Sequence, residues 1–180
     1  MFYIIIIRYK KNTINSEEEI DGIIKSLLAK DIKCIEVTLR TEFALKAIEI
    51  IRLKYQDEIT LVVDTVINKS QVDQIHAIGI DFIVNPGLNV NLSKHIMRAG
   101  IPFIPGVTTP SEIILALENG WDTLKFFPAN LFGGIKAIQT YGAVFPQVKF
   151  CPTGGVNQDT YCDYLNLENV ISVGGSWMMK

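Results

Sequence analysis

The sequence predicts an α/β fold in which one parallel sheet closes into a single (β/α)8 TIM barrel. Short runs rich in β-branched residues alternate with longer amphipathic stretches along all 180 residues. The short runs are almost continuously apolar, which is typical of parallel strands whose two faces are both covered. Because eight such runs occur, we expect closure into a barrel, and an open doubly wound sheet is the alternative.

Each predicted strand is a short apolar run, and each predicted helix has apolar residues at i, i+3 and i+4 on one face. The predicted strands are 3–7, 34–38, 60–65, 82–85, 103–106, 123–127, 148–152 and 170–173. The predicted helices are 17–28, 41–54, 69–77, 91–98, 110–118, 135–141 and 160–165. No proline-rich linker or repeat divides the chain, so we expect residues 1–180 to form one domain.

The first apolar run is too short to cross a bilayer, and its basic residues follow it, so we interpret it as a buried strand and not as a targeting segment. A net charge of -2 gives no field that would attract nucleic acid or an anionic membrane. The three cysteines, Cys34, Cys151 and Cys162, lack CxxC spacing and favour a reduced, cytoplasmic compartment. No metal or other cofactor is expected, because His76 and His95 have no partner at ligand spacing.

Three polar side chains share one face of the second predicted strand. Glu36, Thr38 and Arg40 alternate with Val37 and Leu39, so they point the same way. At the carboxyl end of a barrel strand, a carboxylate can transfer protons and a guanidinium can bind an anion. A purely structural Glu36–Arg40 pair is the alternative.

Lys125 is isolated among apolar and aromatic residues in the sixth predicted strand, Thr123–Phe127. Loss of water from an ammonium favours the neutral amine, which can condense with a carbonyl to form a Schiff base. Lys125 is therefore the first candidate for catalysis. A surface lysine on an edge strand is the alternative.

Two glycine-rich turns are predicted after the seventh and eighth strands, at Thr153–Gly155 and at Gly174–Ser176. Loops at these two places often bind phosphate in TIM barrels, because glycine lets backbone N–H groups approach an oxyanion. Arg8, after the first strand, is expected to add a positive charge at the same edge. Glycines that only permit tight turns are the alternative.

Several motifs resemble those of the 2-keto-3-deoxy-6-phosphogluconate (KDPG) and 4-hydroxy-2-oxoglutarate (KHG) aldolases. The resemblance extends through nearly the whole chain in order. The motifs are Ile35–Glu42, Asn85–Leu88, Ile101–Gly106, Lys125–Ala129, Phe150–Gly155 and Gly174–Trp177.

The resemblance implies a homotrimeric, metal-independent class I aldolase that cleaves a 2-keto-4-hydroxy acid into pyruvate and an aldehyde. It implies that Lys125 forms the Schiff base and that Glu36 is the general acid and base. Substrate-binding residues would be Arg40, Thr65, Pro86, Phe127 and Thr153, with Thr153 contacting the substrate hydroxyl. Phosphate-binding residues would be Arg8, Gly154, Gly155, Gly175 and Ser176.

The chain departs from the resemblance at its third strand, where Val62, Val63 and Asp64 replace a usual Gly-Ala-Gly before Thr65. If Thr65 faces the substrate, strand alternation predicts that Asp64 faces the helices, unless a bend brings its carboxylate back. Asn85 replaces a more usual serine. Helices that usually flank the barrel at both ends are also expected to be missing.

Three functional interpretations follow from these motifs. The first is the pyruvate-forming aldolase, acting on KDPG, on KHG or on both. The second is a catalytically weak barrel that still binds phosphate and keto acids, which the changed third strand favours. The third is another phosphate-handling barrel isomerase or synthase, which would use the glycine loops without needing Lys125.

Overall fold

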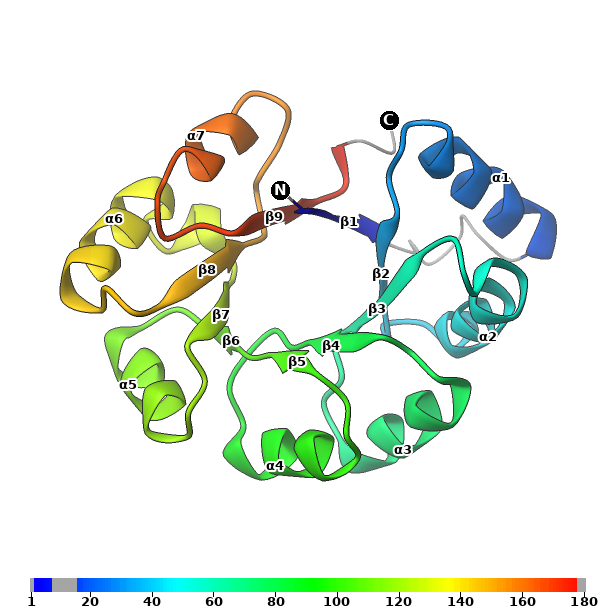
Figure 1. Cartoon of the computed structure of the whole chain (residues 1–180), viewed down its shortest axis with the longest axis horizontal. Coiled ribbons are helices and arrows are strands. Elements are labelled where there is room, and N and C mark those ends of the chain that lie inside the picture. The colour runs from blue at the N-terminus through cyan, green and yellow to red at the C-terminus, as the bar shows by residue number, and fades with distance from the viewer. Residues whose placement is uncertain (1, 8–15, 178–180) are drawn as a thin grey trace.

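A computed structural model describes residues 2–7 and 16–177, in which a ring of strands is surrounded by helices (Figure 1). The strands are β1 Phe2–Ile7, β2 Cys34–Thr38, β3 Thr60–Asp64, β4 Phe82–Val84, β5 Phe103–Ile104, β6 Gly106–Val107, β7 Thr123–Phe126, β8 Lys149–Pro152 and β9 Ser172–Gly175. The α-helices are α1 Glu17–Leu28, α2 Phe43–Tyr55, α3 Lys69–Ile78, α4 Val90–Arg98, α5 Pro110–Glu118, α6 Gly134–Val144 and α7 Tyr161–Leu165, and a 3₁₀ turn, η1, covers Ala129–Leu131.

The strands pair in parallel in the order β5-β4-β3-β2-β1-β9 and in the order β6-β7-β8. Only Pro105 separates β5 from β6, so these two strands continue one another around the ring. On the other side, single bridges from Phe150 to Val170 and from Thr153 to Gly174 join the β8 segment to the β9 segment. The arrangement is the predicted (β/α)8 barrel.

Two strand predictions are wrong in detail. The fifth predicted strand, 103–106, is divided at Pro105, where pairing passes from β4 on one side to β7 on the other. The eighth predicted strand, 170–173, is displaced toward the C-terminus, because β1 provides ladder partners for Gly174 and Gly175. Glycine has a low intrinsic preference for strands, and here pairing within the fold outweighs it.

Side-chain caps explain why several helices begin where they do. The side chains of Ser16, Asn68, Asn89 and Thr109 each accept a hydrogen bond from the backbone N–H three residues later. These bonds satisfy amides that have no partner inside the helix. The predicted starts of α1, α3 and α5 are correct, and α4 begins one residue earlier than predicted. By contrast, α2, which has no side-chain cap, begins two residues later than predicted.

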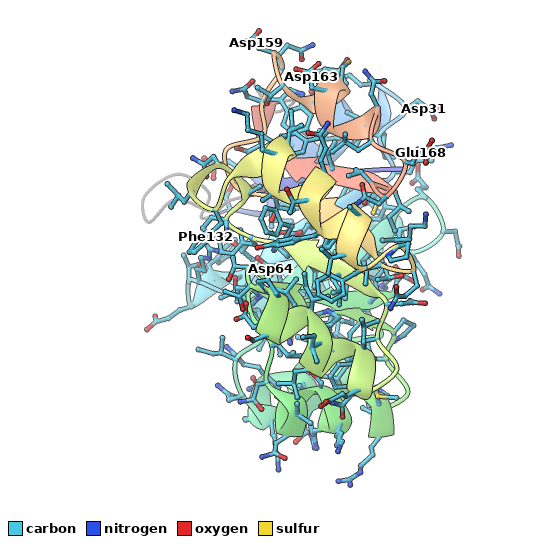
Figure 2. The ribbon with its side chains drawn as sticks, turned by 90° about the vertical axis from the view of Figure 1, so that its left-hand side faces the viewer. Asp31, Asp64, Phe132, Asp159, Asp163 and Glu168 are labelled. Atoms are coloured by element: carbon cyan, nitrogen blue, oxygen red, sulfur yellow. The ribbon has the colours of Figure 1, made fainter. Side chains whose placement is uncertain are left out.

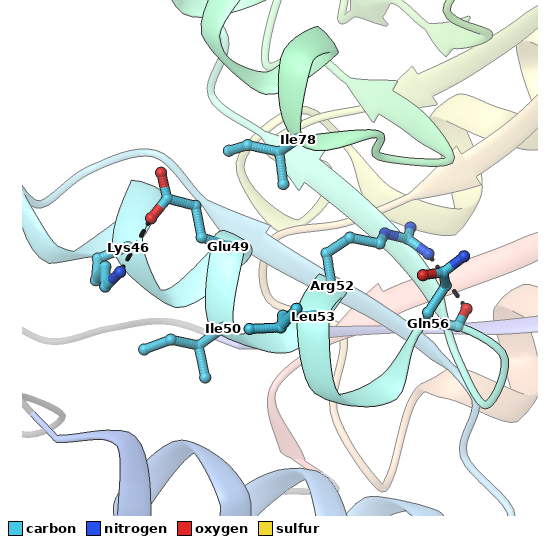
Figure 3. Close-up of a pocket in the computed structure, with 7 residues that line it drawn as sticks. All are labelled: Lys46, Glu49, Ile50, Arg52, Leu53, Gln56 and Ile78. Atoms are coloured by element: carbon cyan, nitrogen blue, oxygen red, sulfur yellow. Dashed lines mark hydrogen bonds and ion pairs between the residues drawn. The ribbon is translucent and has the colours of Figure 1, made fainter.

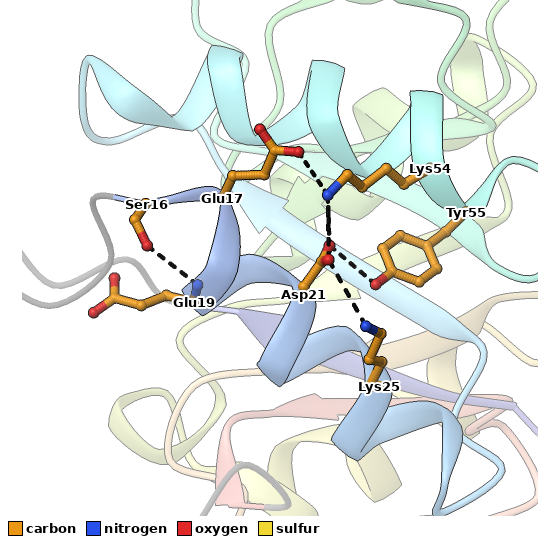
Figure 4. A network of polar contacts seen from close by, with 7 residues as sticks. All are labelled: Ser16, Glu17, Glu19, Asp21, Lys25, Lys54 and Tyr55. Carbon is orange, nitrogen blue, oxygen red and sulfur yellow. Dashed lines mark hydrogen bonds and ion pairs between the residues drawn. The ribbon is translucent and has the colours of Figure 1, made fainter.

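A polar network joins α1 to α2 on the outside of the barrel (Figure 4). Lys54 Nζ lies 2.6 Å from Glu17 Oε1 and 3.2 Å from Asp21 Oδ2, and the Tyr55 hydroxyl donates to Asp21 at 3.1 Å. The hydrogen bond from Lys54 holds the pKa of Asp21 below its ordinary value. The network supplements the apolar contact between these neighbouring helices.

Two apolar clusters lie between the strands and the helices. One contains residues of α1 to α4 with those of the strands they cover, and the other contains residues of α5 to α7 with theirs. Val62, Val84 and Cys151 are fully buried, yet they belong to neither cluster. These side chains therefore fill the inside of the ring, where strand alternation directs them.

No helix within residues 16–177 is both long enough and apolar enough to span a bilayer.

Candidate active site

Lys125 points into the ring from β7. Its neighbours Leu124 and Phe126 pack in the outer apolar cluster, so alternation along the strand turns Lys125 inward. Only 1% of Lys125 is exposed, and Nζ lies 5.0 Å from the centre of the Phe127 ring. Because β7 lies between β6 and β8, the alternative of a surface lysine on an edge strand is wrong.

Asp64 is the ion-pair partner of Lys125, with Oδ1 3.1 Å from Nζ. Both side chains are almost completely buried, at 3% and 1% exposure. The expectation that Asp64 faces the helices is wrong. Leu61 and Val63 occupy the outer cluster, so alternation places Val62 and Asp64 inside the ring.

Thr65 follows β3 with a φ of 65°, in the left-handed region, so the period of the strand no longer fixes the direction of its side chain. Its hydroxyl donates to Asp64 Oδ2 at 3.1 Å and accepts from Arg40 Nε at 3.2 Å. Arg40 Nη2 also lies 3.9 Å from Asp64 Oδ2. In the side view of Figure 2, Asp64 lies at the level between α5 and α6, and only 2% of it is exposed. Lys125, Thr65 and Arg40 thus converge on one carboxylate.

Glu36 is fully buried and projects from β2 into the same interior. Its neighbours Ile35 and Val37 belong to the outer cluster, and Glu36 is level with Val62 of β3. Arg40 forms its ion pair with Asp64, so the geometry gives no support to the alternative of a structural Glu36–Arg40 pair.

Cys151 and Ser172 are interior residues that the sequence analysis did not select. Cys151 is level with Lys125 on the neighbouring strand, and the Ser172 hydroxyl donates to Cys151 Sγ at 3.0 Å. Burial raises the pKa of Cys151 to about 11; the Ser172 hydrogen bond and the Lys125 charge lower it, and the Glu36 charge raises it. The thiol therefore stays protonated near neutral pH. The alternation that turns Lys125 inward was the signal that could have found Cys151.

Thr153 ends the strand ladder next to this interior, and only 1% of it is exposed. Within residues 16–177, its Oγ1 has no hydrogen-bond partner. Gly154 and Gly155 follow with φ angles of 87° and 81°, so the predicted glycine-rich turn is present here. A Cβ on Gly155 would lie 2.3 Å from Asn130, so that position also requires glycine.

The second predicted glycine-rich turn is not a turn, because Gly174 and Gly175 are the last residues of β9. A Cβ on Gly175 would lie 2.0 Å from the Trp177 ring, so a larger residue would collide with it. The bridge between Thr153 and Gly174 sets the two glycine segments side by side, with Ser176 at the end of the second. Arg8 lies outside the described residues.

Pro86 lies in the loop after β4, beside Asn85, at the same edge of the barrel. A hollow of about 350 Å³ is lined there by Val66, Asn85, Pro86 and neighbouring residues. Asn85 is buried, and its Oδ1 has no hydrogen-bond partner in the described part of the chain. The loop is tightly packed, because a Cβ on Gly106 would lie 2.4 Å from the Pro86 carbonyl carbon.

A second hollow lies on the outer surface and is lined by α2 and Ile78 (Figure 3). Its charged side chains already have partners: Lys46 pairs with Glu49 within the lining, and Arg52 pairs with Asp81. None of the predicted site residues lines it. The interior of the barrel remains the candidate active site.

Comparison with known proteins decides the family. The family model for KDPG and KHG aldolase matches residues 9–180. The chain belongs to the KDPG and KHG aldolase family. As a member, it is a class I aldolase, an aldehyde-lyase that works through a Schiff base without a metal.

The family assignment agrees with individual relatives over most of the chain. The 2-dehydro-3-deoxy-phosphogluconate aldolase of Dickeya dadantii (strain 3937) is 41% identical over 92% of this chain and 78% of its own length. The KHG/KDPG aldolase of Escherichia coli (strain K12) is 43% identical over 86% of this chain and 72% of its own length. A crystal structure of KDPG aldolase from Legionella pneumophila holds pyruvate captured as a covalent carbinolamine. Its sequence is 40% identical to this chain, and the two structures superpose with a TM-score of 0.89. The match covers 97% of this chain and 82% of the Legionella pneumophila chain.

Proposed function

We propose that this aldolase cleaves KDPG, KHG or both, giving pyruvate with glyceraldehyde 3-phosphate or glyoxylate. The observation that carries the proposal is the amine of Lys125, which is enclosed in the barrel interior 5.0 Å from the centre of the Phe127 ring. The names of the relatives support the choice of substrates, and the captured pyruvate of the Legionella pneumophila enzyme supports the covalent chemistry.

In the proposed reaction, the Lys125 amine adds to the C2 carbonyl, and loss of water leaves a protonated iminium. Glu36 accepts the proton of the C4 hydroxyl while the C3–C4 bond breaks. The electron pair of that bond passes to the iminium and forms an enamine, and the aldehyde leaves. Protonation of the enamine at C3 and hydrolysis of the iminium release pyruvate and restore the amine.

The remaining predicted residues are proposed to hold the substrate. Arg40 and Thr65 would bind the carboxylate and its neighbouring groups, with Pro86 and Phe127 beside them. The buried hydroxyl of Thr153, which has no partner in the described part of the chain, is suited to the substrate hydroxyl. Gly154, Gly155, Gly175 and Ser176, which follow neighbouring strands, would bind the phosphate together with Arg8.

We further propose that residues 1–180 form one domain and assemble as a homotrimer, as the sequence resemblance implies. Sedimentation equilibrium should give three times the mass of one chain. The three cysteines are free, which is compatible with the proposed cytoplasmic compartment.

A catalytically weak barrel is the second candidate function, and one observation favours it. Asp64, in place of a usual glycine, lies 3.1 Å from the amine that must react. Formation of the imine therefore requires that ion pair to separate.

Borohydride reduction in the presence of pyruvate tests the proposal, because hydride converts the iminium to a stable secondary amine. Mass mapping should place the adduct on Lys125. Replacement of Lys125 by Met, which is similar in length and uncharged, should abolish the adduct, and Lys136→Met, on an outer helix, should keep it. An undiminished adduct in Lys125→Met would refute the assignment. Measured turnover of KDPG and KHG distinguishes the active aldolase from the weak one.

A further inference from the structure

Asp64 is a carboxylate with one anchored oxygen and one oxygen that faces the reacting amine. The Thr65 hydroxyl donates to Oδ2 at 3.1 Å, and Arg40 Nε donates to the same hydroxyl at 3.2 Å. Oδ1 lies 3.1 Å from Lys125 Nζ. The carboxylate is therefore fixed through Oδ2 and presents Oδ1 to the group that must form the imine.

Oδ1 of Asp64 can still accept a hydrogen bond. It is buried, and within residues 16–177 it accepts none, because Nζ approaches it as an ion-pair partner and not along a hydrogen-bond direction. Stability alone does not account for the pair, because a buried ion pair seldom stabilises a fold more than apolar residues of similar volume would. Buried polar atoms are normally satisfied, so Oδ1 is suited to a donor that arrives with the substrate.

Formation of an imine needs both a proton acceptor and a proton donor close to Nζ. An ammonium has no electron pair with which to attack a carbonyl, so it must first lose a proton. The hydroxyl of the carbinolamine must later gain a proton in order to leave as water. Only 1% of Lys125 is exposed, so bulk water has little access to the amine to carry these protons.

Asp64 lies where both transfers can occur. In the carbinolamine, the hydroxyl oxygen is two bonds from Nζ, because both atoms are attached to C2. A carboxylate oxygen 3.1 Å from Nζ is therefore within reach of that hydroxyl as well.

Glu36, the other interior carboxylate, occupies a different level of the barrel. It pairs with Val62 in the register of β2 and β3. Asp64 pairs with Thr38, one inward-facing position closer to the carboxyl ends of the strands. The interior therefore contains two carboxylates in separate places, and only one of them has a role in the reaction proposed above.

We infer that Asp64 is a further catalytic residue, which transfers the protons of imine formation between Lys125 and the departing water. The inference rests on the proposed imine at Lys125 and deepens it. Asp64 accepts a proton from the ammonium, and the neutral amine forms the N–C2 bond as an electron pair of the carbonyl passes to its oxygen. Protonated Asp64 then gives its proton to that oxygen.

The second half of the sequence uses the same carboxylate again. Asp64 accepts a proton from the nitrogen and donates it to the carbinolamine hydroxyl. The C2–O bond breaks, water leaves, and the electron pair of the nitrogen forms the iminium. Asp64 ends as a carboxylate, so the protons lost by the ammonium are the two that leave in the water.

Rapid mixing tests the inference through the rate of imine formation. Enzyme and saturating pyruvate are mixed, and samples are quenched in borohydride at increasing times, so that the amount of Lys125 adduct reports how fast the imine forms. The measurement is made on the unaltered enzyme, on Asp64→Asn and on Asp57→Asn. Asparagine keeps the shape of the side chain but cannot carry the proton. Asp57 is exposed, so its variant makes the same chemical change outside the barrel.

At saturating pyruvate, Asp64→Asn should form the imine roughly 10²-fold to 10⁴-fold more slowly, the range for loss of a positioned acid and base. Asp57→Asn should form it at the rate of the unaltered enzyme. If Asp64 did no more than hold the ammonium, its replacement would free the amine and speed the reaction. A faster or unchanged rate in Asp64→Asn would therefore overturn the inference.

Asp64→Gly covers the case in which Asp64→Asn does not fold, because related sequences usually carry glycine at this position. The glycine leaves space for formate, a small carboxylate that can carry the same protons. Formate should raise the rate of imine formation in Asp64→Gly, and chloride at equal ionic strength should not. A rate that already equals that of the unaltered enzyme, or that formate raises no more than chloride does, would count against the role of Asp64. If the unaltered enzyme itself forms no adduct with pyruvate, the proposed function fails instead.

Discussion

At the scale of single residues, the fully buried carboxylate of Glu36 is proposed to move the proton that allows the C3–C4 bond to break. Glu36→Gln keeps the shape of the side chain but cannot accept that proton. Cleavage should fall roughly 10²-fold to 10⁴-fold, while pyruvate is still trapped on Lys125. Steady-state cleavage and borohydride trapping, measured on the same preparation, separate the two steps.

The matched control for Glu36→Gln is Glu58→Gln, which makes the same change at an exposed position and should leave both measurements unchanged. Near-normal cleavage by Glu36→Gln would assign the proton transfer to another group. Asp64, 3.1 Å from Lys125 Nζ, would then be the next candidate.

Ser176 is predicted to donate a hydrogen bond to the distal phosphate of the substrate. Ser176→Ala should cost about 1.5–3 kcal/mol in kcat/KM for KDPG, the range for a hydrogen bond to a charged group, and little for KHG, which has no phosphate. Ser26→Ala, at an exposed position of α1, is the control. Equal losses on both substrates would contradict a role in phosphate binding.

How far the sequence predicts the site depends on the residue. The interior place of Lys125 follows from its apolar neighbours and from the two-residue period of a strand. Asp64 was misplaced because alternation was counted from Thr65, whose φ of 65° places it outside the regular strand. Counting from Val63, which packs against the helices, gives the correct face. A left-handed residue at a strand end has no clear signal in one sequence.

At the scale of elements, the start of α5 is fixed by a capping box. Thr109 Oγ1 accepts from the Glu112 N–H at 3.3 Å, and Glu112 Oε2 accepts from the Thr109 N–H at 2.8 Å. Thr109→Ala should lower the free energy of unfolding by about 1 kcal/mol. Urea titration measures the loss, and Thr140→Ala, on the exposed surface of α6, should cost less.

The same cap should make stability depend on pH through Glu112. Burial tends to raise the pKa of Glu112, but hydrogen bonds from Thr108 and Thr109 outweigh it and hold the pKa below its ordinary value of 4.5. The folded protein therefore favours the charged form. This stabilisation is complete well above pH 4.5 and is lost as the pH falls through the lower pKa of the folded state.

Glu112→Gln should consequently lower the urea midpoint near pH 7, and the difference from the unaltered protein should shrink below about pH 4. Urea titrations at pH 7 and pH 3 check this. A difference that is the same at both pH values would mean that Glu112 acts through packing and not through its charge.

Caps also explain which element boundaries the sequence predicts. Ser16, Asn68 and Thr109 precede helices whose starts are correctly predicted, because a cap is a local signal. The end of β9 is set instead by pairing with β1, which is distant in the sequence. Gly174 and Gly175 were therefore mistaken for a turn.

At the scale of the whole molecule, the alternating pattern was sufficient to predict a barrel, but it could not predict how the ring is connected. The ring passes from one sheet to the other at Pro105 and closes through two single bridges beside β9. Phe103 packs against both apolar clusters, and its ring lies 5.3 Å from that of Trp121. These contacts couple the two parts of the barrel.

That coupling predicts a single cooperative unfolding transition. Trp121 and Trp177 are the two tryptophans, and both belong to the cluster beneath α5 to α7, so tryptophan fluorescence reports on that part of the barrel. Far-UV circular dichroism also reports on α1 to α4, which cover the other cluster. If residues 1–180 are one domain, urea transitions followed by the two signals should have the same midpoint at a fixed protein concentration. The midpoints should coincide because a shared ring cannot lose one part and keep the strand pairing of the other intact. A fluorescence midpoint clearly separated from the dichroism midpoint would contradict this prediction and would mean that the two parts unfold independently.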